Sequence, residues 1–267
     1  MSIKRENSGR RSIQVEIEVP GTPEEVWRAI ATGPGISAWF VPTTSDEREG
    51  GQLVCTFGPG MDCPAKITAW QPPKRFVAEG DLGAPGSPTM ATEWSVEARA
   101  GGVCLVRVVH SLFANTDDWD NQLEGMEQGW PTYFQILRMR LTHFRGMPCS
   151  SMQLLGISSE GEAIAWEKLG GALGLTKLAQ GQKWTAPAGV PRLAGVVELV
   201  GKGMHPNTVL LRLDTPAPGS AYIGAFSCGG MVQVAASVYL YGDQARSAIE
   251  RDEPTWQKFM GNLFPTG

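Results

Sequence analysis

The stretch SIQVEIEVPGTPEEVWRAI, Ser12–Ile30, joins a strand pattern directly to a helix pattern. Its first half places an apolar residue at every second position over Ile13–Val19, which is typical of a half-buried strand. Thr22 follows as a candidate N-cap, with Pro23 at the first helical position and Glu25 completing a capping box. The stretch therefore predicts a strand that leads at once into a helix.

The residues after this helix change to a pattern of short strands. The helix should end in TGPG, Thr32–Gly35, because Pro34 disfavours helix before it, and a short helix or turn, ISAWF, should follow. From Gly51 on, short apolar runs are separated by glycine and proline and predict an antiparallel sheet. The runs are QLVCTF, AKITAW, RFVAEGD, ATEWSVEA and VCLVRVVHSLF.

A long amphipathic helix is predicted over residues 129–146, GWPTYFQILRMRLTHFRG, because its large apolar residues recur at helical spacing. The acidic residues 115–128 before it are interpreted as a loop or ragged helix, with Asp117, Asp118 and Asp120 in solvent. Residues 1–11 are polar and are expected to form a flexible tail.

The remaining residues repeat this order. SSMQLLGISS predicts a strand and GEAIAWEKLGGALGL a helix, with Trp166 and Leu169 spaced as Trp27 and Ile30 are. Further strand-like runs follow, and the final DEPTWQKFMGNLF predicts a terminal helix in which Trp256 corresponds to Trp130. We therefore expect two tandem domains, 12–147 and 151–267, of which the second is degenerate.

The first domain resembles the START-like or SRPBCC superfamily, in the subfamily named after the C-terminal domain of the activator of the Hsp90 ATPase. The matching features are TPEEVWRAI leading into ISAWF, then WQPPKRF, HSLF and the GW that opens the last helix. The resemblance implies an α+β helix-grip fold of the Bet v 1 type, a curved antiparallel sheet around a long C-terminal helix. In the second domain TKLAQGQKW stands where ISAWF would be, so a working cavity is expected only in the first.

An apolar cavity between sheet and helix would bind a small hydrophobic or aromatic molecule. We interpret Trp27 as core and the Trp39–Phe40 pair as the rim of this cavity. The rings could also simply fill the core. The candidate ligand-binding residues are Trp39, Phe40, Phe57, Trp70, Trp94, Phe113, Trp119, Trp130, Phe134 and Leu137.

No catalytic or metal-binding pattern is visible. The five cysteines lack CxxC spacing and are expected to be reduced, and the three histidines are too scattered for a metal site. No nucleophile is paired with a base, so the sequence favours a binding protein without cofactor or covalent catalysis. Asp62, Lys66 and Glu93 are weak candidates for charged groups facing a cavity.

Composition limits the partners. The net charge of −4 and the scattered basic residues argue against nucleic acid, and no run approaches the ~20 apolar residues that span a bilayer. With no apolar leader after the basic N-terminus, a cytoplasmic protein is expected. The sequence leaves open a cyclase- or aromatase-like enzyme acting on a polyketide-type substrate, and a stress-related or co-chaperone-like interaction module. It also leaves open homodimer contact.

Overall fold

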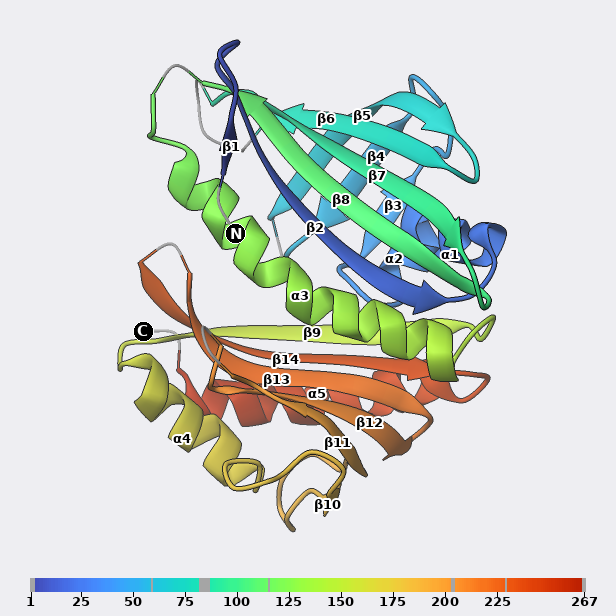
Figure 1. Ribbon diagram of the computed structural model, residues 1–267. Coiled ribbons are helices and arrows are strands. Elements are labelled where there is room, and N and C mark those ends of the chain that lie inside the picture. The colour runs from blue at the N-terminus through green and yellow to red at the C-terminus, as the bar shows by residue number, and fades with distance from the viewer. Residues whose placement is uncertain are drawn as a thin grey trace. The chain divides into compact units, whose positions relative to one another are not determined.

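The protein consists of two compact units, Met1–Arg145 and Gly146–Gly267. Each combines one antiparallel sheet with helices, in the α+β arrangement expected from the sequence (Figure 1). The computed structural model describes residues 3–58, 60–81, 87–114, 116–202, 205–228 and 230–265.

The first unit contains an eight-stranded antiparallel sheet in the order β1-β2-β8-β7-β6-β5-β4-β3. The five predicted runs form β4 to β8, whereas the short β3 was not predicted. The strands are β1 (Lys4–Arg5), β2 (Arg10–Pro20), β3 (Thr43–Ser45), β4 (Gln52–Thr56), β5 (Asp62–Gln71), β6 (Arg75–Asp81), β7 (Thr89–Arg99) and β8 (Val103–Phe113).

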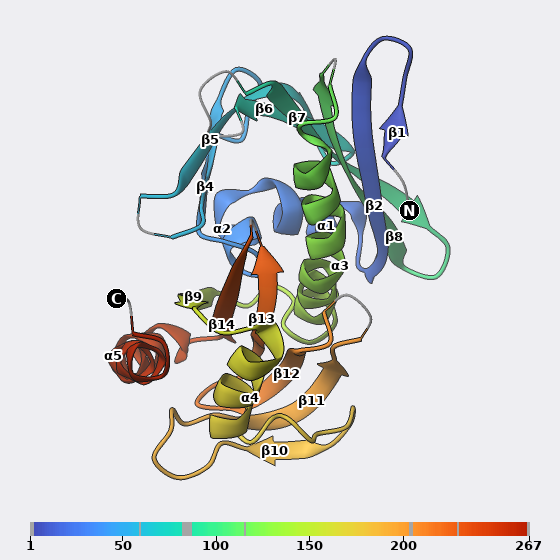
Figure 2. The ribbon, with the colours of Figure 1, turned by 90° about the vertical axis from the view of Figure 1, so that its left-hand side faces the viewer.

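Three helices complete this unit: α1 (Pro23–Ala31), α2 (Gly33–Ser37) and α3 (Asp120–His143). The predicted capping box is present, because the Thr22 side chain accepts the Glu25 N–H and the Glu25 carboxylate accepts the Thr22 N–H at 2.9 Å. The sheet curves around α2 and α3 (Figure 2), which confirms the helix-grip fold. The core consequently lies between the inner face of the sheet and α3.

The second helix begins earlier after α1 than the sequence predicted. α1 does end at TGPG, but α2 begins within that segment, at Gly33, rather than at ISAWF. Thr32 allows this, since its hydroxyl donates to the Arg28 carbonyl at 2.8 Å and accepts the Gly35 N–H at 3.1 Å. One side chain thus closes the first helix and caps the second.

The expectation of a flexible tail is wrong for the described part of residues 1–11. β1 pairs with β2, with Lys4 opposite Ser12 and Arg5 opposite Arg11. The N-terminal residues therefore form a hairpin on the edge of the sheet. Met1 and Ser2 lie outside the described residues.

The acidic stretch also differs from the prediction, because α3 begins at Asp120 instead of residue 129. Asp120 is buried and accepts hydrogen bonds of 2.6 Å from both Arg5 and Arg11, and Arg11 also donates to Asp117 at 2.6 Å. Burial opposes ionisation of the Asp120 carboxyl, but the two guanidinium donors outweigh it and lower its pKa. Of the three aspartates predicted in solvent, Asp117 and Asp118 are exposed, whereas Asp120 is buried.

The second unit has a six-stranded antiparallel sheet in the order β10-β11-β12-β13-β14-β9. Its first strand, β9, pairs with its last, β14, as β2 pairs with β8 in the first unit. Helices α4 and α5 pack with the sheet in one core cluster, in which Trp166 and Trp256 are buried. The elements are β9 (Cys149–Ser158), α4 (Glu162–Ala172), β10 (Lys183–Thr185), β11 (Ala194–Val200), β12 (Thr208–Thr215), β13 (Gly219–Cys228), β14 (Met231–Tyr241) and α5 (Ala245–Leu263).

The second unit is the simpler of the two. Within residues 173–182, all of which are described, turns stand where the first unit has α2. Its sheet has six strands against eight, and its terminal helix begins at Ala245, before the predicted DEPTW segment. These differences agree with the prediction of a degenerate repeat.

Candidate functional site

Aromatic rings fill the space between the inner face of the first sheet and α3. Trp94 on β7 meets Trp130 of α3 edge to face at 5.1 Å, and both contact Phe134 at 6.0 and 5.5 Å. Trp94, Trp130 and Phe134 are buried, as is Leu137 one turn further along α3. Centroid separations of this size are typical of favourable aromatic pairs, so these rings form a continuous packed cluster.

Trp39 belongs to the core and not to a rim. Its side chain is fully buried, and its indole Nε1–H donates to the Ala29 carbonyl at 2.8 Å. The ring also contacts Trp94 at 6.0 Å. The hydrogen bond ties the segment after α2 back to α1, which is a structural role.

Phe40, the other half of the predicted pair, is half-buried and joins rings from several elements. It stacks on Trp130 at 5.1 Å, meets Tyr133 of α3 edge to face at 4.7 Å, and contacts Phe57 after β4 at 5.7 Å. Phe57 and Tyr133 are half-buried as well. We call Phe40, Phe57 and Tyr133 the aromatic rim, since they are half-buried rings joined through Phe40, which stacks on the buried Trp130.

A second group of rings extends the cluster towards α1. Trp27 contacts Trp70 at 5.0 Å and Phe76 at 5.8 Å, and Phe76 continues to Trp94 at 6.5 Å. Trp27 and Phe76 are buried, whereas Trp70 is half-buried. Trp27 therefore packs in the core, as interpreted from the sequence.

His110 of β8 is a polar group within this apolar cluster. His110 is 5% exposed, and its Nε2 accepts the Trp130 indole N–H at 2.7 Å. The neutral ring then carries its proton on Nδ1, which donates to Thr92 Oγ1 at 2.9 Å. Desolvation by burial lowers the pKa of His110 from 6.5 to about 4, so the imidazole is neutral at pH 7.

The structure does not bring all the predicted residues together. Phe113 is 65% exposed at the end of β8, and Trp119 packs with Ile13, Leu112 and Leu123 in a separate cluster. Sequence reasoning missed Tyr133 and His110. Tyr133 lies three residues after Trp130 on the same helix, a spacing that could have identified it.

The three charged candidates, Asp62, Lys66 and Glu93, have surroundings that are ordinary for surface residues. Glu93 accepts a 2.6 Å bond from Arg75, and Asp62 accepts one of 2.6 Å from Thr56. Lys66 lies beside a surface hollow of about 340 Å³ at the β4–β5 edge. Within the described ranges, no three His, Cys, Asp or Glu side chains are grouped to hold a metal ion.

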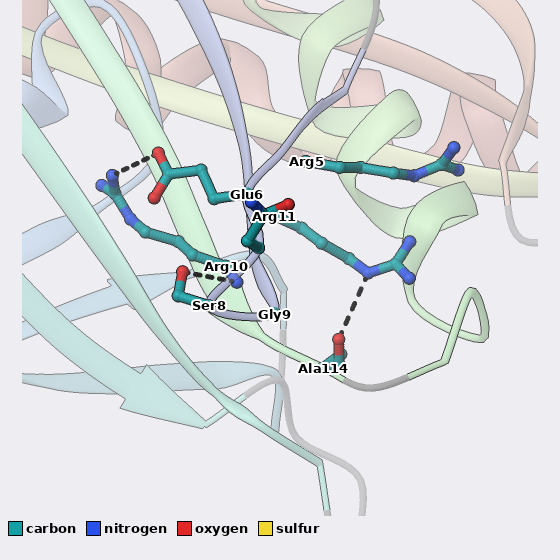
Figure 3. Close-up of a pocket in the computed structure, with 8 residues that line it drawn as sticks. Arg5, Glu6, Ser8, Gly9, Arg10, Arg11 and Ala114 are labelled. Carbon is teal, nitrogen blue, oxygen red and sulfur yellow. Dashed lines mark hydrogen bonds and ion pairs between the residues drawn. The ribbon is translucent and has the colours of Figure 1, made fainter.

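A second surface hollow, of about 270 Å³, lies at the N-terminal hairpin. In Figure 3 the Arg10 side chain turns toward Glu6, and Arg11 reaches the Ala114 carbonyl. Since Arg5 and Arg11 also bind Asp120, their guanidinium groups are already engaged. The hollow is lined by a structural ion-pair network.

The sequence of the first unit is similar to that of a known protein family. Residues 20–142 match the family model "Activator of Hsp90 ATPase homolog 1-like protein". The first unit, Met1–Arg145, is therefore similar to this family, and we call it the activator-like unit. The matched range begins at the end of β2 and ends in the last turn of α3, so it includes the aromatic cluster of this activator-like unit.

Several solved structures are similar to the chain at low identity. CalU16 from Micromonospora echinospora is 22% identical and covers 53% of this chain and 83% of its own, with a TM-score of 0.43. The Aha1 dimer from Colwellia psychrerythraea is 19% identical and covers 49% and 96%, with a TM-score of 0.42. The di-domain ARO/CYC BexL is 13% identical and covers 96% and 99%, with a TM-score of 0.46. With such low identities and TM-scores, these similarities do not indicate what the activator-like unit does.

No curated protein sequence matches the chain. None of the helices in the described ranges is both long and apolar enough to cross a membrane.

Proposed function

We propose that the activator-like unit binds a small hydrophobic or aromatic molecule between the inner face of its sheet and α3. The aromatic rim carries this proposal. Phe40, Phe57 and Tyr133 come from three parts of the chain and are half-buried; Phe40 and Tyr133 contact the buried Trp130, and Phe57 contacts Phe40. Partly exposed rings that converge over an apolar interior are the usual lining of a small-molecule site.

Entry of a ligand requires movement of Phe40. Its ring stacks on Trp130 at 5.1 Å with an interplanar angle of 30°, so a flat apolar molecule could insert between the two rings and keep Phe40 as one wall of the site. Phe40 lies in the connection between α2 and β3, outside both elements. Trp39 beside it is held by the bond to Ala29, and the rest of the cluster can keep its packing.

Ligand screening of the full chain tests the proposal. Thermal shift and tryptophan fluorescence would be measured with fatty acids, flavonoids, polyketides and sterols. A binder at 100 times its dissociation constant should stabilise the fold by about 2.7 kcal/mol. Absence of any binder in this panel would contradict the proposal and favour the interaction-module alternative.

A matched pair of variants tests the location. Phe40→Ala removes one aromatic wall and should weaken binding by about 1 to 3 kcal/mol. Phe113→Ala removes an exposed ring outside the cluster and should leave the affinity unchanged. Equal affinities of the two variants would place the ligand elsewhere. Conversion of a ligand to product, lost in Glu93→Gln, would instead favour the cyclase-like alternative.

A further inference from the structure

Cys55 of β4 and Cys63 of β5 lie directly opposite each other in the first sheet. Side chains of opposite residues in an antiparallel pair project from the same face, with Cβ atoms about 4.5 to 5.5 Å apart. Both thiols are free. The sequence shows no CxxC pattern here, so only the register reveals the pair.

The geometry of this pair falls within disulfide reach. The Phe57 N–H donates to the Met61 carbonyl at 3.0 Å, so Phe57 and Met61 form a hydrogen-bonded pair. Cys55 and Cys63 are two residues further along each strand, so they form a pair of the same kind, with Cα atoms about 5.5 Å apart. Disulfides span Cα separations of about 4.4 to 6.8 Å. The two Cβ atoms, about 5.5 Å apart in such a pair, must approach to the roughly 3.5 to 4.5 Å of a disulfide.

The two thiols differ in how accessible they are to solvent. Cys63 is exposed, whereas Cys55 is half-buried and receives a contact of 3.5 Å from Thr43 Oγ1. Burial raises the pKa of both thiols, and the Asp62 carboxylate raises that of Cys63 further. Since the thiolate is the reacting form, oxidation is slow at neutral pH and begins at the accessible Cys63.

We propose that Cys55 and Cys63 are a redox-modification site that forms a reversible cross-strand disulfide with a small-molecule disulfide as oxidant. The Cys63 thiolate attacks one sulfur of the oxidant, forms a mixed disulfide and releases one thiolate, which takes up a proton. Cys55 then loses its proton and attacks the Cys63 sulfur, which releases the second thiol. Two protein thiols are oxidised and one small disulfide is reduced to two thiols.

The disulfide would restrain the end of β4, which the rim residue Phe57 directly follows. Phe57 follows Cys55 by two positions and lies on the same face of the sheet. In the middle of β5 this face carries Ile67, which is fully buried. The cross-link therefore ties β4 to β5 beside the aromatic rim, but its formation does not depend on ligand binding.

Peptide mapping of the unaltered full chain tests the proposal. The folded protein is incubated with mixtures of oxidised and reduced glutathione, quenched with acid, alkylated and digested with trypsin. Because no Lys or Arg lies between the two cysteines, both fall in one tryptic peptide, Glu49–Lys66. This peptide should lose two hydrogens in mass and remain one linked species after cleavage before Asp62. Reducing agent should reverse both changes.

Variants and pH supply the controls. Cys149→Ser should cross-link like the wild type, whereas Cys55→Ser should stop at a glutathione adduct on Cys63. The rate in the wild type should fall about tenfold per pH unit below the thiol pKa. Separate glutathione adducts on Cys55 and Cys63, unchanged thiols, or a cross-link that forms only in urea would each overturn the proposal.

Discussion

Trp39 and Phe40 are neighbours in sequence with different roles. Trp39 is fully buried and its indole bonds to Ala29, so Trp39→Ala leaves both a void and an unpaired carbonyl. We expect a loss of about 3 to 5 kcal/mol in the free energy of unfolding, comparable to Trp27→Ala. Phe40→Ala should lower the free energy of unfolding by less, because Phe40 is only half-buried. Urea denaturation measures all three, and a Trp39→Ala variant as stable as Phe40→Ala would show that Trp39 is not core.

His110 makes the stability depend on pH. The pKa of His110 is about 4 in the folded protein, compared with the ordinary value of 6.5 that applies in the unfolded chain. The unfolded chain therefore binds the proton more readily. The contribution of His110 is complete above pH 6.5 and is lost as the pH falls towards 4, by about 3 kcal/mol in all. Denaturation at a series of pH values measures this slope.

Two variants isolate the His110 contribution. His110→Gln keeps an acceptor for the Trp130 N–H but cannot titrate, so its stability should change less between pH 6.5 and 4. His143→Gln, at an exposed site at the end of α3, should keep the wild-type slope. Identical slopes in His110→Gln and the wild type would refute the buried neutral imidazole.

The N-terminal hairpin and α3 are joined through one side chain. Asp120 lies in the first turn of α3 and bonds to Arg5 on β1 and Arg11 on β2. Asp120→Asn removes the charge that pairs with both arginines and favours a helix N-terminus. We expect a lower melting temperature and faster hydrogen exchange in the first turns of α3.

Asp118→Asn is the matched control for this element. Asp118 is exposed and accepts a bond from Thr116. Its replacement should leave the melting temperature and the exchange of α3 close to the wild type. If Asp120→Asn behaved in the same way, the hairpin would not hold the start of α3.

Local patterns predicted most elements, because alternation and caps act over a few residues. The β2 alternation and the Thr22 cap are of this kind. The early start of α3 was missed, because the contacts of Asp120 reach residues more than 100 positions away. The burial of Trp39 was missed for a similar reason, since it depends on how α2 returns to α1. Pairs such as Cys55 with Cys63 depend on register, which composition does not reveal.

At the scale of the whole molecule, the two units share a strand order but not an aromatic cluster. In the second unit Trp256 is buried and contacts Phe259 at 5.9 Å, and the Trp184 indole donates to the Leu173 carbonyl at 3.0 Å. These contacts serve its own core. Among the described residues, the rim of half-buried rings around a central tryptophan is a feature of the first unit, and one ligand per chain is therefore expected.

NMR of the indole N–H groups tests this central claim most directly. The chain has nine tryptophans, and each indole signal can be assigned with a Trp→Phe variant. Saturation with a binder from the ligand panel should shift the signals of Trp94 and Trp130, while those of Trp184 and Trp256 keep their positions. A binder that shifts Trp184 or Trp256 and leaves Trp130 unchanged would contradict the account.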